Sequence, residues 1–296
     1  MKVFVTGASG FIGSAVVSEL LRAGHQVVGL ARSEKSASAI RASGAEVIRG
    51  KLEDVAVLQE AASEADGVVH TGFSHDFMAS GDFSQYPKAA ELDRAAILAM
   101  GEALAGTQKA LVVTSGMLGL PLIGGVVTEE STTRESARLS EIAALELAGK
   151  GIRASVVRLP PSVHDRGDAG FVPSIIGLAK KHGVSAYPSG GNRWCAVHRQ
   201  DAASLFRLAV EGGSTGALYN AVGDESVALE GIATLIGQEL QLPVQAVEGA
   251  ELARHFEWMQ YFITMDCPAT ALATREELGW LPAHPGLLED MQAHYF

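Results

Sequence analysis

Three glycines, Gly7, Gly10 and Gly13, recur at every third position directly after the apolar stretch Val3–Val5. A strand, such a turn and a helix form the context in which a glycine-rich segment binds a pyrophosphate, although a strand–turn–helix without a ligand has the same pattern. Gly7 permits the tight turn, Gly10 lets a phosphate approach the backbone, and Gly13 lets the helix pack closely on the strand. Exposed N–H groups at the helix start would hold the anion. The backbone expected around it is that of Gly7, Ser9, Gly10, Phe11, Ile12 and Gly13.

The residues after the second apolar strand, Val27–Ala31, indicate which dinucleotide such a turn would bind. Sites for NAD usually carry an acidic side chain here, which holds the ribose 2′-hydroxyl. In this chain Arg32 and Ser33 occupy the place, and Lys35 follows. Because a guanidinium makes charge-assisted, often bidentate hydrogen bonds to phosphate, we predict NADP(H) as the cofactor. The alternative is that Arg32 is a solvated surface charge.

Apolar strands alternate with amphipathic helices through the first half of the chain, and this alternation would position both sites. Strands are expected at residues 3–5, 27–31, 46–49, 67–70, 110–114 and 154–158. Helices are expected around residues 12–20 and at 36–43, 55–65, 92–104 and 137–148. Strands separated by helices of this length imply right-handed βαβ units. The predicted fold class is therefore α/β, with a Rossmann-type doubly wound parallel sheet covered on both faces.

The pattern changes after Pro160–Pro161, where glycine, proline and aromatic residues become frequent. A helix at 201–211, a strand at 217–222 and a helix at 229–240 are still expected. We predict a dinucleotide-binding domain over residues 1–165, to which residues 196–223 return. Residues 166–195 and 224–296 are predicted to form a smaller, irregular substrate lobe. A cleft between the two would be the default ligand site.

The composition restricts the partners. The chain has 296 residues, of which 34 are acidic and 23 basic, so its net charge is −11. Such a chain is a poor non-specific partner for nucleic acid or an anionic membrane. The two cysteines, Cys195 and Cys267, lack the paired spacing of a metal site, so no metal is expected. Since Met1–Lys2 leads directly into a strand, we expect no secretory signal and a cytoplasmic protein.

Several segments, taken in order, carry a resemblance to a known family. They are Thr6–Gly13, Val69–Gly72, Val113–Ser115, Arg158–His164, Val197–Asp201 and Leu278–Trp280. Together they resemble the cofactor and cleft segments of the extended short-chain dehydrogenases/reductases, the sugar-nucleotide epimerase and dehydratase group. The resemblance implies further cofactor contacts at Leu52, His70, Thr71, Gly72, Thr114, Pro160 and Val163.

The departures from this family concern its catalytic residues. Members carry a tyrosine followed four residues later by a lysine, and no tyrosine of this chain is followed in that way. The alignment places Arg138 and Ile142 at the two positions, and Asp93 where the family has an asparagine. The chain therefore resembles the atypical branch, which keeps the cofactor fold without the catalytic pair.

Three residues are candidates for the missing chemistry. Ser115 would donate a hydrogen bond to a substrate oxygen, unless Gly116 holds the family position and Ser115 bonds only to backbone. Arg138 would stabilise a developing alkoxide, although its pKa makes it a poor proton donor and a surface role is the alternative. Asp93 would belong to a water relay or simply hold the helix.

Histidine and aromatic side chains would supply the substrate pocket. Histidines titrate near neutrality and are therefore candidates for proton transfer. The predicted pocket residues are His75, Met117, His164, Phe171, Trp194, His198 and Trp258. Such a lining favours a small, partly apolar carbonyl compound. A sugar nucleotide would need basic anchors for its diphosphate, and only Arg193 and Arg199 are obvious there.

These features favour an NADPH-dependent oxidoreductase that reduces a ketone or aldehyde. A nucleotide-sugar epimerase or dehydratase is the second hypothesis, and a catalytically silent NADP(H) sensor is the third. The expected partner is a small-molecule substrate, without nucleic acid or membrane. The resemblance also implies a homodimer through the helices expected at 92–104 and 137–148, whose alternative role is to cover the sheet.

Overall fold

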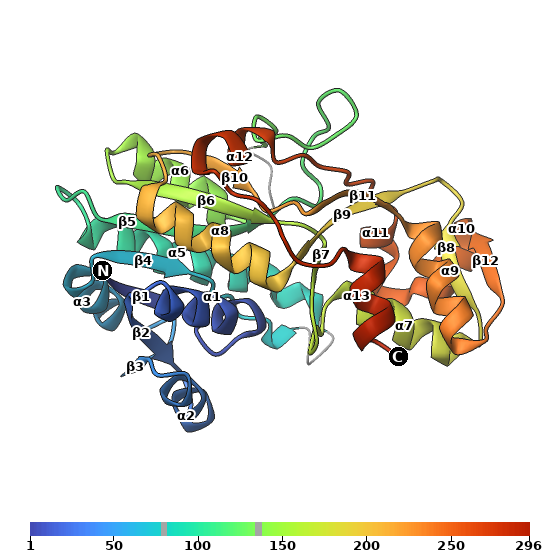
Figure 1. The fold of residues 1–296 in the computed structure, drawn as a ribbon, viewed down its shortest axis with the longest axis horizontal. Helices are drawn as coiled ribbons and strands as arrows, with labels where there is room; N and C mark the ends of the chain where they lie inside the picture. The colour runs from blue at the N-terminus through green and yellow to red at the C-terminus, as the bar shows by residue number, and fades with distance from the viewer. Residues whose placement is uncertain (78–81, 134–137) are drawn as a thin grey trace.

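The computed structural model describes residues 1–77, 82–133 and 138–296, and its first half alternates strands and helices as the sequence predicts (Figure 1). The strands of this part are β1 (Lys2–Thr6), β2 (Gln26–Ala31), β3 (Glu46–Arg49), β4 (Gly67–His70), β5 (Ala110–Gly116) and β6 (Ala154–Leu159). The helices are α1 (Phe11–Arg22), α2 (Glu34–Ala42), α3 (Val55–Glu64), η1 (Phe83–Gln85), α5 (Tyr86–Ala103) and α6 (Ser140–Gly149).

The later part of the chain contains shorter strands between helices. The strands are β7 (Ser162–His164), β8 (Ser185–Pro188), β9 (Arg193–His198), β10 (Leu218–Asn220), β11 (Asp224–Ala228) and β12 (Val244–Val247). The helices are α7 (Phe171–His182), α8 (Arg199–Gly212), α9 (Leu229–Leu240), α10 (Gly249–Phe256), η2 (Glu257–Met259), α11 (Gln260–Ile263), α12 (Leu272–Leu278) and α13 (Leu287–His294).

The central sheet has seven parallel strands in the order β10-β6-β5-β4-β1-β2-β3. This confirms the predicted Rossmann-type fold class, in which the chain runs outward from β1 in both directions. Because the direction of winding reverses between β1 and β4, the loops at their carboxyl ends diverge and leave room for a ligand. The glycine turn lies at this point.

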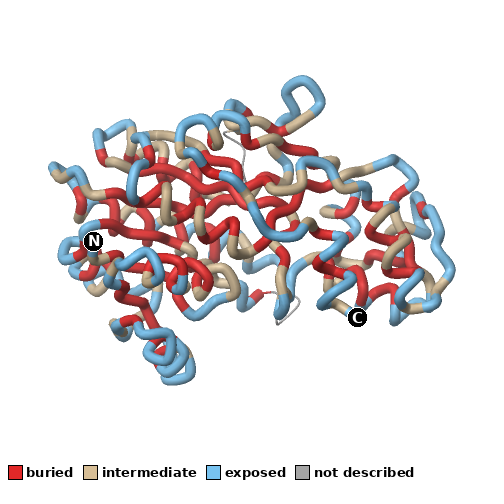
Figure 2. Tube along the Cα trace, in the orientation of Figure 1, coloured by how far each residue is buried: buried red, intermediate tan, exposed pale blue. Residues whose placement is uncertain are grey.

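Two apolar cores cover the two faces of the sheet, and alternate residues of each strand enter them. On β1, Val3 and Val5 pack into the core beneath α1 and α8, whereas Phe4 packs into the core beneath α3, α5 and α6. Val69 and Val68 of β4 divide in the same way. In Figure 2 the strands and the inner sides of these helices form a continuous buried layer. The sheet is therefore rigid at the edge where the glycine turn leaves it.

Some helices begin at other residues than the sequence predicts. The helix expected at 92–104 begins at Tyr86, with Pro87 in the first turn where its missing N–H costs nothing. The helix expected at 137–148 begins at Ser140, while residue 137 lies outside the described residues. Helix α7 was not predicted, because Pro173 and the nearby glycines resemble a loop. Its apolar positions Val172, Ile175, Ile176 and Ala179 nevertheless repeat with helical spacing and are buried.

Most of the remaining elements form a second layered region, at the right of Figure 1, whereas α12 lies beside β10. The region contains a three-stranded sheet in the order β11-β9-β7 and a two-stranded pair, β12 with β8. Strand β10 instead joins the main sheet beside β6, and α8 packs along α1. None of the helices in the described part of the chain is both long enough and apolar enough to span a membrane.

Candidate functional site

The glycine turn joins β1 to the first residue of α1. Gly7 adopts φ +66°, in the left-handed region that favours glycine, and its carbonyl accepts a 2.8 Å hydrogen bond from the Gly10 N–H. Gly10 occupies the N-cap position with extended backbone and has no side chain with which to cap the helix. The N–H groups that follow, from Phe11 onward, are thus available to an anion at the positive end of the helix dipole.

Close packing around the turn leaves no room for larger side chains. A Cβ atom added to Gly13 would lie 2.1 Å from the Gly7 carbonyl oxygen. One added to Gly7 would lie 2.7 Å from the backbone of Thr71 and Gly72, which follow β4. The Thr71 hydroxyl also donates a 2.8 Å hydrogen bond to the Thr6 carbonyl. The structure therefore brings four predicted cofactor residues together, Gly7, Gly13, Thr71 and Gly72, and the residues fit a pyrophosphate.

The other predicted contacts at this edge are distributed over the turn and the neighbouring loops. Ser9 is exposed and Ile12 half-buried on the turn, and Leu52 lies beside Gly72, 3.3 Å from the position of a Cβ added there. Val163 is half-buried on β7, and Pro160 is buried before it. These residues share one end of the sheet, and which of them touch a cofactor stays a prediction.

A cationic side chain stands at the end of β2. Arg32 is exposed, and its Nη1 lies 3.2 Å from both carboxylate oxygens of Asp76, which follows β4. Ser33 caps α2 by accepting a 3.1 Å hydrogen bond from the Ser36 N–H. Arg32 therefore faces across the carboxyl ends of the strands, and Asp76 would compete with a phosphate for it.

His70 is buried inside the protein, and its side chain bonds to neighbouring residues. Its Nδ1 lies 2.7 Å from the Thr6 hydroxyl, and its Nε2 donates a 2.9 Å hydrogen bond to Asp93 Oδ1. Thr114 is also buried, and its hydroxyl donates a 2.8 Å hydrogen bond to the His70 carbonyl. The side chains of His70 and Thr114, predicted to contact cofactor, thus tie β1, β4 and β5 together.

Asp93 links this core histidine to Arg138. The Ser140 hydroxyl donates a 2.6 Å hydrogen bond to Asp93 Oδ2 and accepts one of 3.2 Å from Arg138 Nε. We call Thr6, His70, Asp93, Ser140 and Arg138 the Asp93 network. Burial alone would raise the pKa of Asp93, but the hydrogen bond and charge of His70, aided by Arg138 and Ser140, outweigh it and lower that pKa. Asp93 is therefore an ionised anchor that positions Arg138 through Ser140.

Aromatic side chains surround the guanidinium of Arg138. Its central carbon lies 4.8 Å from the ring centre of Phe73, which in turn packs against His75 at 5.0 Å and Tyr86 at 5.9 Å. Desolvation by these neighbours, followed by the charge of Arg138, lowers the pKa of His75. Burial raises the pKa of Tyr86 by more than Arg138 lowers it. Near neutral pH, Tyr86 thus keeps its proton and His75 is mostly uncharged.

These rings continue toward the second lobe. Phe77 contacts both Tyr86 and Phe83, and Phe83 stacks on Trp258 with ring centres 5.5 Å apart. Trp258 and Phe171 lie 6.3 Å apart, and Phe262 lies 5.2 Å from Phe171. These rings are here called the aromatic band, which consists of Phe73, His75, Phe77, Phe83, Tyr86, Phe171, Trp258 and Phe262. It brings the predicted pocket residues His75, Phe171 and Trp258 into one surface with Arg138.

Two other predicted pocket residues belong to the core. Met117 and Trp194 are fully buried, and the Met117 sulfur lies 3.8 Å from Cys195 Sγ. A sequence does not distinguish large apolar side chains that line a ligand site from those of a core. The packing of Met117 and Trp194 places both in the core. His164 is also fully buried, with Nδ1 2.9 Å from Asp290 Oδ2.

The end of β5 bears on the choice between Ser115 and Gly116. Ser115 is buried and faces Arg158 of β6 in the register. Gly116 is half-buried, and a Cβ added to it would meet nothing within 4 Å. Gly116 therefore has open space beside it, whereas Ser115 lies within the sheet, and a contact of Ser115 with substrate stays a prediction.

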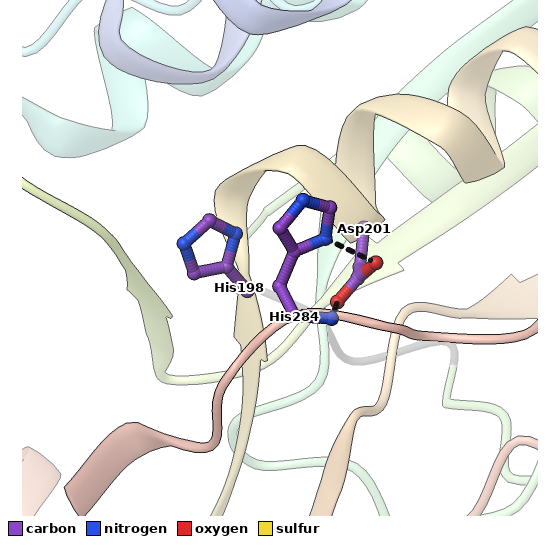
Figure 3. Close-up of side chains that lie close together, drawn as sticks. All are labelled: His198, Asp201 and His284. Carbon is purple, nitrogen blue, oxygen red and sulfur yellow. Dashed lines mark hydrogen bonds and ion pairs between the residues drawn. The ribbon is translucent and has the colours of Figure 1, made fainter. Parts of the chain in front are cut away.

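His198 lies in a polar cluster with Asp201 and His284 (Figure 3). The two imidazole rings stack with centres 4.6 Å apart and planes within 7° of parallel. Their in-plane lone pairs therefore do not converge on one point, as a shared metal ion would need. His198 Nδ1 accepts a hydrogen bond from the Gln200 N–H. The Asp201 carboxylate accepts hydrogen bonds from the His284 ring Nδ1 and from the backbone N–H groups of Ala283 and His284. These bonds hold the C-terminal segment against the start of α8.

Sequence reasoning overlooked two residues of this site. Ser140 begins α6 and Tyr86 begins α5, and neither belongs to a motif with a chemical role. Ser140 is recognised only once Asp93 and Arg138 are seen on either side of its hydroxyl. Tyr86 is recognised only from the rings around it, because no lysine follows it in the family's spacing.

Comparisons with known proteins identify a family for this chain. The family described as NAD(P)H-binding matches residues 7–158. A protein of Schizosaccharomyces pombe, named as uncharacterized, is 44% identical over 98% of both chains. A Stigmatella aurantiaca ketoreductase, which acts on 4-hydroxy-2-methyl-3-oxo-4-farnesyl-3,4-dihydroquinoline-1-oxide, is 27% identical over 92% of this chain and 85% of its own.

A solved structure shares the whole fold. The dTDP-glucose 4,6-dehydratase of Streptomyces venezuelae, with NAD bound, superimposes with a TM-score of 0.77 at 17% identity, over 99% of this chain and 97% of that one. At this identity the similarity concerns the fold alone. The wound sheet and second lobe described above are thus an arrangement found in a nucleotide-sugar enzyme.

Proposed function

The chain belongs to the NAD(P)H-binding family and has the fold of the extended short-chain dehydrogenases/reductases, and from this we propose that it is an NADP(H)-dependent oxidoreductase that reduces a small ketone or aldehyde. The observation that carries the proposal is the position of Arg138. The Asp93 network holds its guanidinium against the aromatic band, at the edge of the sheet where the glycine turn lies.

The aromatic band supports a carbonyl substrate over a sugar nucleotide. Its rings offer apolar surface, and Arg193, one of the two basic residues considered for a diphosphate, is paired to Asp266 at 2.6 Å. The ketoreductase relative acts on a compound with a farnesyl chain, which is compatible with an apolar lining. Reversible oxidation of a sugar hydroxyl would also need a base, and the family's tyrosine–lysine pair is absent from the sequence.

The cofactor would be held by the first helix and the end of β2. The Phe11 and Ile12 N–H groups would bind the pyrophosphate, and Arg32 with Ser33 would bind the 2′-phosphate. When bound, the dinucleotide supplies the hydride for reduction. The protein's tasks are then to orient the carbonyl and to stabilise the negative charge that develops on its oxygen.

Arg138 and Tyr86 divide these tasks. A guanidinium cannot give up its proton near neutral pH, so Arg138 acts by charge and hydrogen bonding. Tyr86 retains its proton because burial raises its pKa, and it would donate that proton to the alkoxide. His75 would be a weaker donor, since its lowered pKa leaves it mostly unprotonated.

Arg138→Gln is expected to lower kcat/KM for carbonyl reduction about 100-fold, as expected for loss of a preorganised donor to a developing oxyanion. Tyr86→Phe should lower kcat while changing its pH dependence above neutrality. Stopped-flow oxidation of NADPH over a panel of ketones and aldehydes would measure both variants. Arg94→Gln is the matched control, since Arg94 pairs with Glu146 at 2.9 Å on the outer side of α5.

Three results would contradict the proposal. Unchanged turnover in Arg138→Gln would show that Arg138 takes no part in the reaction. Tight NADPH binding by the wild-type protein with no turnover of any carbonyl compound would instead favour the nucleotide sensor. Conversion of a UDP- or dTDP-sugar without net oxidation of coenzyme, monitored by chromatography of the sugar nucleotide, would favour the epimerase or dehydratase hypothesis.

Arg32→Gln should weaken NADPH binding about tenfold and leave NADH binding nearly unchanged, because only NADPH presents a 2′-phosphate to this side chain. Asp76→Asn should strengthen NADPH binding, since it removes the carboxylate that pairs with Arg32. Fluorescence titration with each coenzyme would measure both effects. An equal loss for both coenzymes in Arg32→Gln would contradict the assignment of the 2′-phosphate.

A further inference from the structure

A second arginine lies against the residue that begins the first helix. The guanidinium carbon of Arg199 lies 4.7 Å from the ring centre of Phe11. Phe11 is the first residue of α1, and its N–H belongs to the expected pyrophosphate site. Arg199 is likewise the first residue of α8, with His198 as its N-cap. A cation from a distant part of the sequence thus adjoins the glycine turn.

Helix α8 packs along α1 through buried apolar side chains, and two further contacts lie between the helices. Besides the Arg199–Phe11 contact, Arg207 Nε donates a 2.8 Å hydrogen bond to Glu19 Oε1. Arg207 and Glu19 lie about two helical turns beyond Arg199 and Phe11 in their own helices. The helices therefore run side by side in the same direction, as Figure 1 shows, and their N-termini lie together. The position of Arg199 follows from helix packing instead of from a mobile loop.

The guanidinium of Arg199 retains hydrogen-bonding capacity. Its Nη2 lies 3.2 Å from Asp165 Oδ2, on the loop after β7. Its Nε is buried and has no hydrogen-bond partner among the described residues. Only about one fifth of the side chain is accessible, at 22%. A partly buried guanidinium with an unused donor is costly unless another acceptor satisfies it.

We propose that Arg199 binds the pyrophosphate of the dinucleotide, opposite the backbone N–H groups of the glycine turn. The inference rests on dinucleotide binding by this family, and it adds a contact that the glycine motif does not contain. A pyrophosphate carries two negative charges and several acceptor oxygens, so it would satisfy Arg199 better than Asp165 alone. The Asp165 carboxylate would then keep its second neighbour, His198 Nε2, which lies 3.8 Å from Asp165 Oδ1.

The arrangement separates the two phosphate groups of NADPH between two arginines. Arg32 lies at the end of β2, where the adenosine ribose is expected, and Arg199 lies against Phe11 at the start of α1. Arg199 should therefore serve NADPH and NADH equally, because both contain the pyrophosphate. Arg32 should distinguish between them. Substitution of Arg199 should therefore change the dissociation constants of both coenzymes, whereas substitution of Arg32 should change that of NADPH alone.

The test compares Arg199→Gln with Arg207→Gln, a matched control on the same helix whose side chain is 24% accessible and also paired to a carboxylate. Isothermal titration calorimetry would use NADPH, NADH and adenosine 2′-monophosphate, which carries the 2′-phosphate but no 5′-phosphate. Arg199→Gln should weaken both dinucleotides by a similar factor, about tenfold or more, and leave the binding of the monophosphate unchanged. Arg207→Gln should change none of the three dissociation constants.

Unchanged dinucleotide binding in folded Arg199→Gln would overturn the proposal, and so would an equal loss for adenosine 2′-monophosphate. If that variant does not fold, Asp165→Asn provides the test, since removal of the competing carboxylate should tighten both dinucleotides at low salt. Unchanged or weaker binding in Asp165→Asn would then reject the role of Arg199. Absence of dinucleotide binding by the wild-type protein would instead refute the proposed function itself.

Discussion

Gly13→Ala is expected to weaken NADPH binding at least about 100-fold, which corresponds to about 2.7 kcal/mol. The added methyl group would overlap the Gly7 carbonyl oxygen, since the Cβ position lies only 2.1 Å from it. The two nearest atoms, the carbonyl oxygen and carbonyl carbon of Gly7, are backbone atoms of the turn. The turn must therefore move away from α1 to relieve the clash. Such a displacement separates the N–H groups that bind the pyrophosphate. Fluorescence titration with NADPH would measure the loss.

Gly177→Ala provides the control for this substitution. Gly177 also lies within a helix, but a Cβ added there meets nothing within 4 Å. The change should leave NADPH binding unaltered and raise the stability of the protein slightly, because alanine favours helix more than glycine does. Full affinity in a folded Gly13→Ala variant would show that the pyrophosphate does not bind at this turn.

Asp93→Ala is expected to lower the free energy of unfolding by about 3 kcal/mol or more at neutral pH. Asp93 is buried, and its two oxygens accept hydrogen bonds from His70 and Ser140. Truncation would leave both donors without their acceptor in the interior, which costs more than the loss of one exposed ion pair. Arg138 would also lose the support of Ser140. Denaturant unfolding would measure the loss of stability.

Asp93→Asn separates the charge from the shape of this side chain. The native pKa of Asp93 is lowered, because hydrogen bonding and charge from its partners outweigh burial. A carboxyl with a lowered native pKa stabilises the fold above its unfolded pKa, and this contribution is lost as the pH falls through the native pKa. The stability difference between wild type and Asp93→Asn should therefore stay constant from about pH 7 to about pH 5 and shrink as the pH falls below the unfolded pKa, about 3.9. A difference that shrinks already near neutral pH, or that does not change in acid, would contradict an Asp93 whose native pKa is lowered.

The parts of this protein that sequence predicted well depend on short-range patterns. The glycine spacing and the apolar stretch before it determine a local turn, and Arg32 directly follows a strand whose end is easily located. Strand-and-helix alternation then determines the parallel sheet, since crossover connections of this length have one handedness. The fold class follows from these local features, and the same features mark where we propose that the dinucleotide binds.

The parts that escaped prediction depend on contacts between distant segments. Ser140 lies 47 residues from its partner Asp93, and Arg199 lies far along the chain from Phe11. No local pattern marks such pairs, because the contact exists only when two helices have packed. Met117 and Trp194 illustrate the same limit, since their apolar character is equally suited to a pocket wall and to the core they occupy.

The central claim is that α1 and the end of β2 together bind NADP(H). Calorimetric titration of the purified protein with NADPH and, separately, NADH tests it most directly. We expect saturable binding of one NADPH per chain, tighter than that of NADH and reduced at high salt, as expected for charge-assisted phosphate contacts. Absence of measurable heat with either coenzyme would contradict the claim, and tighter binding of NADH would contradict the role given to Arg32.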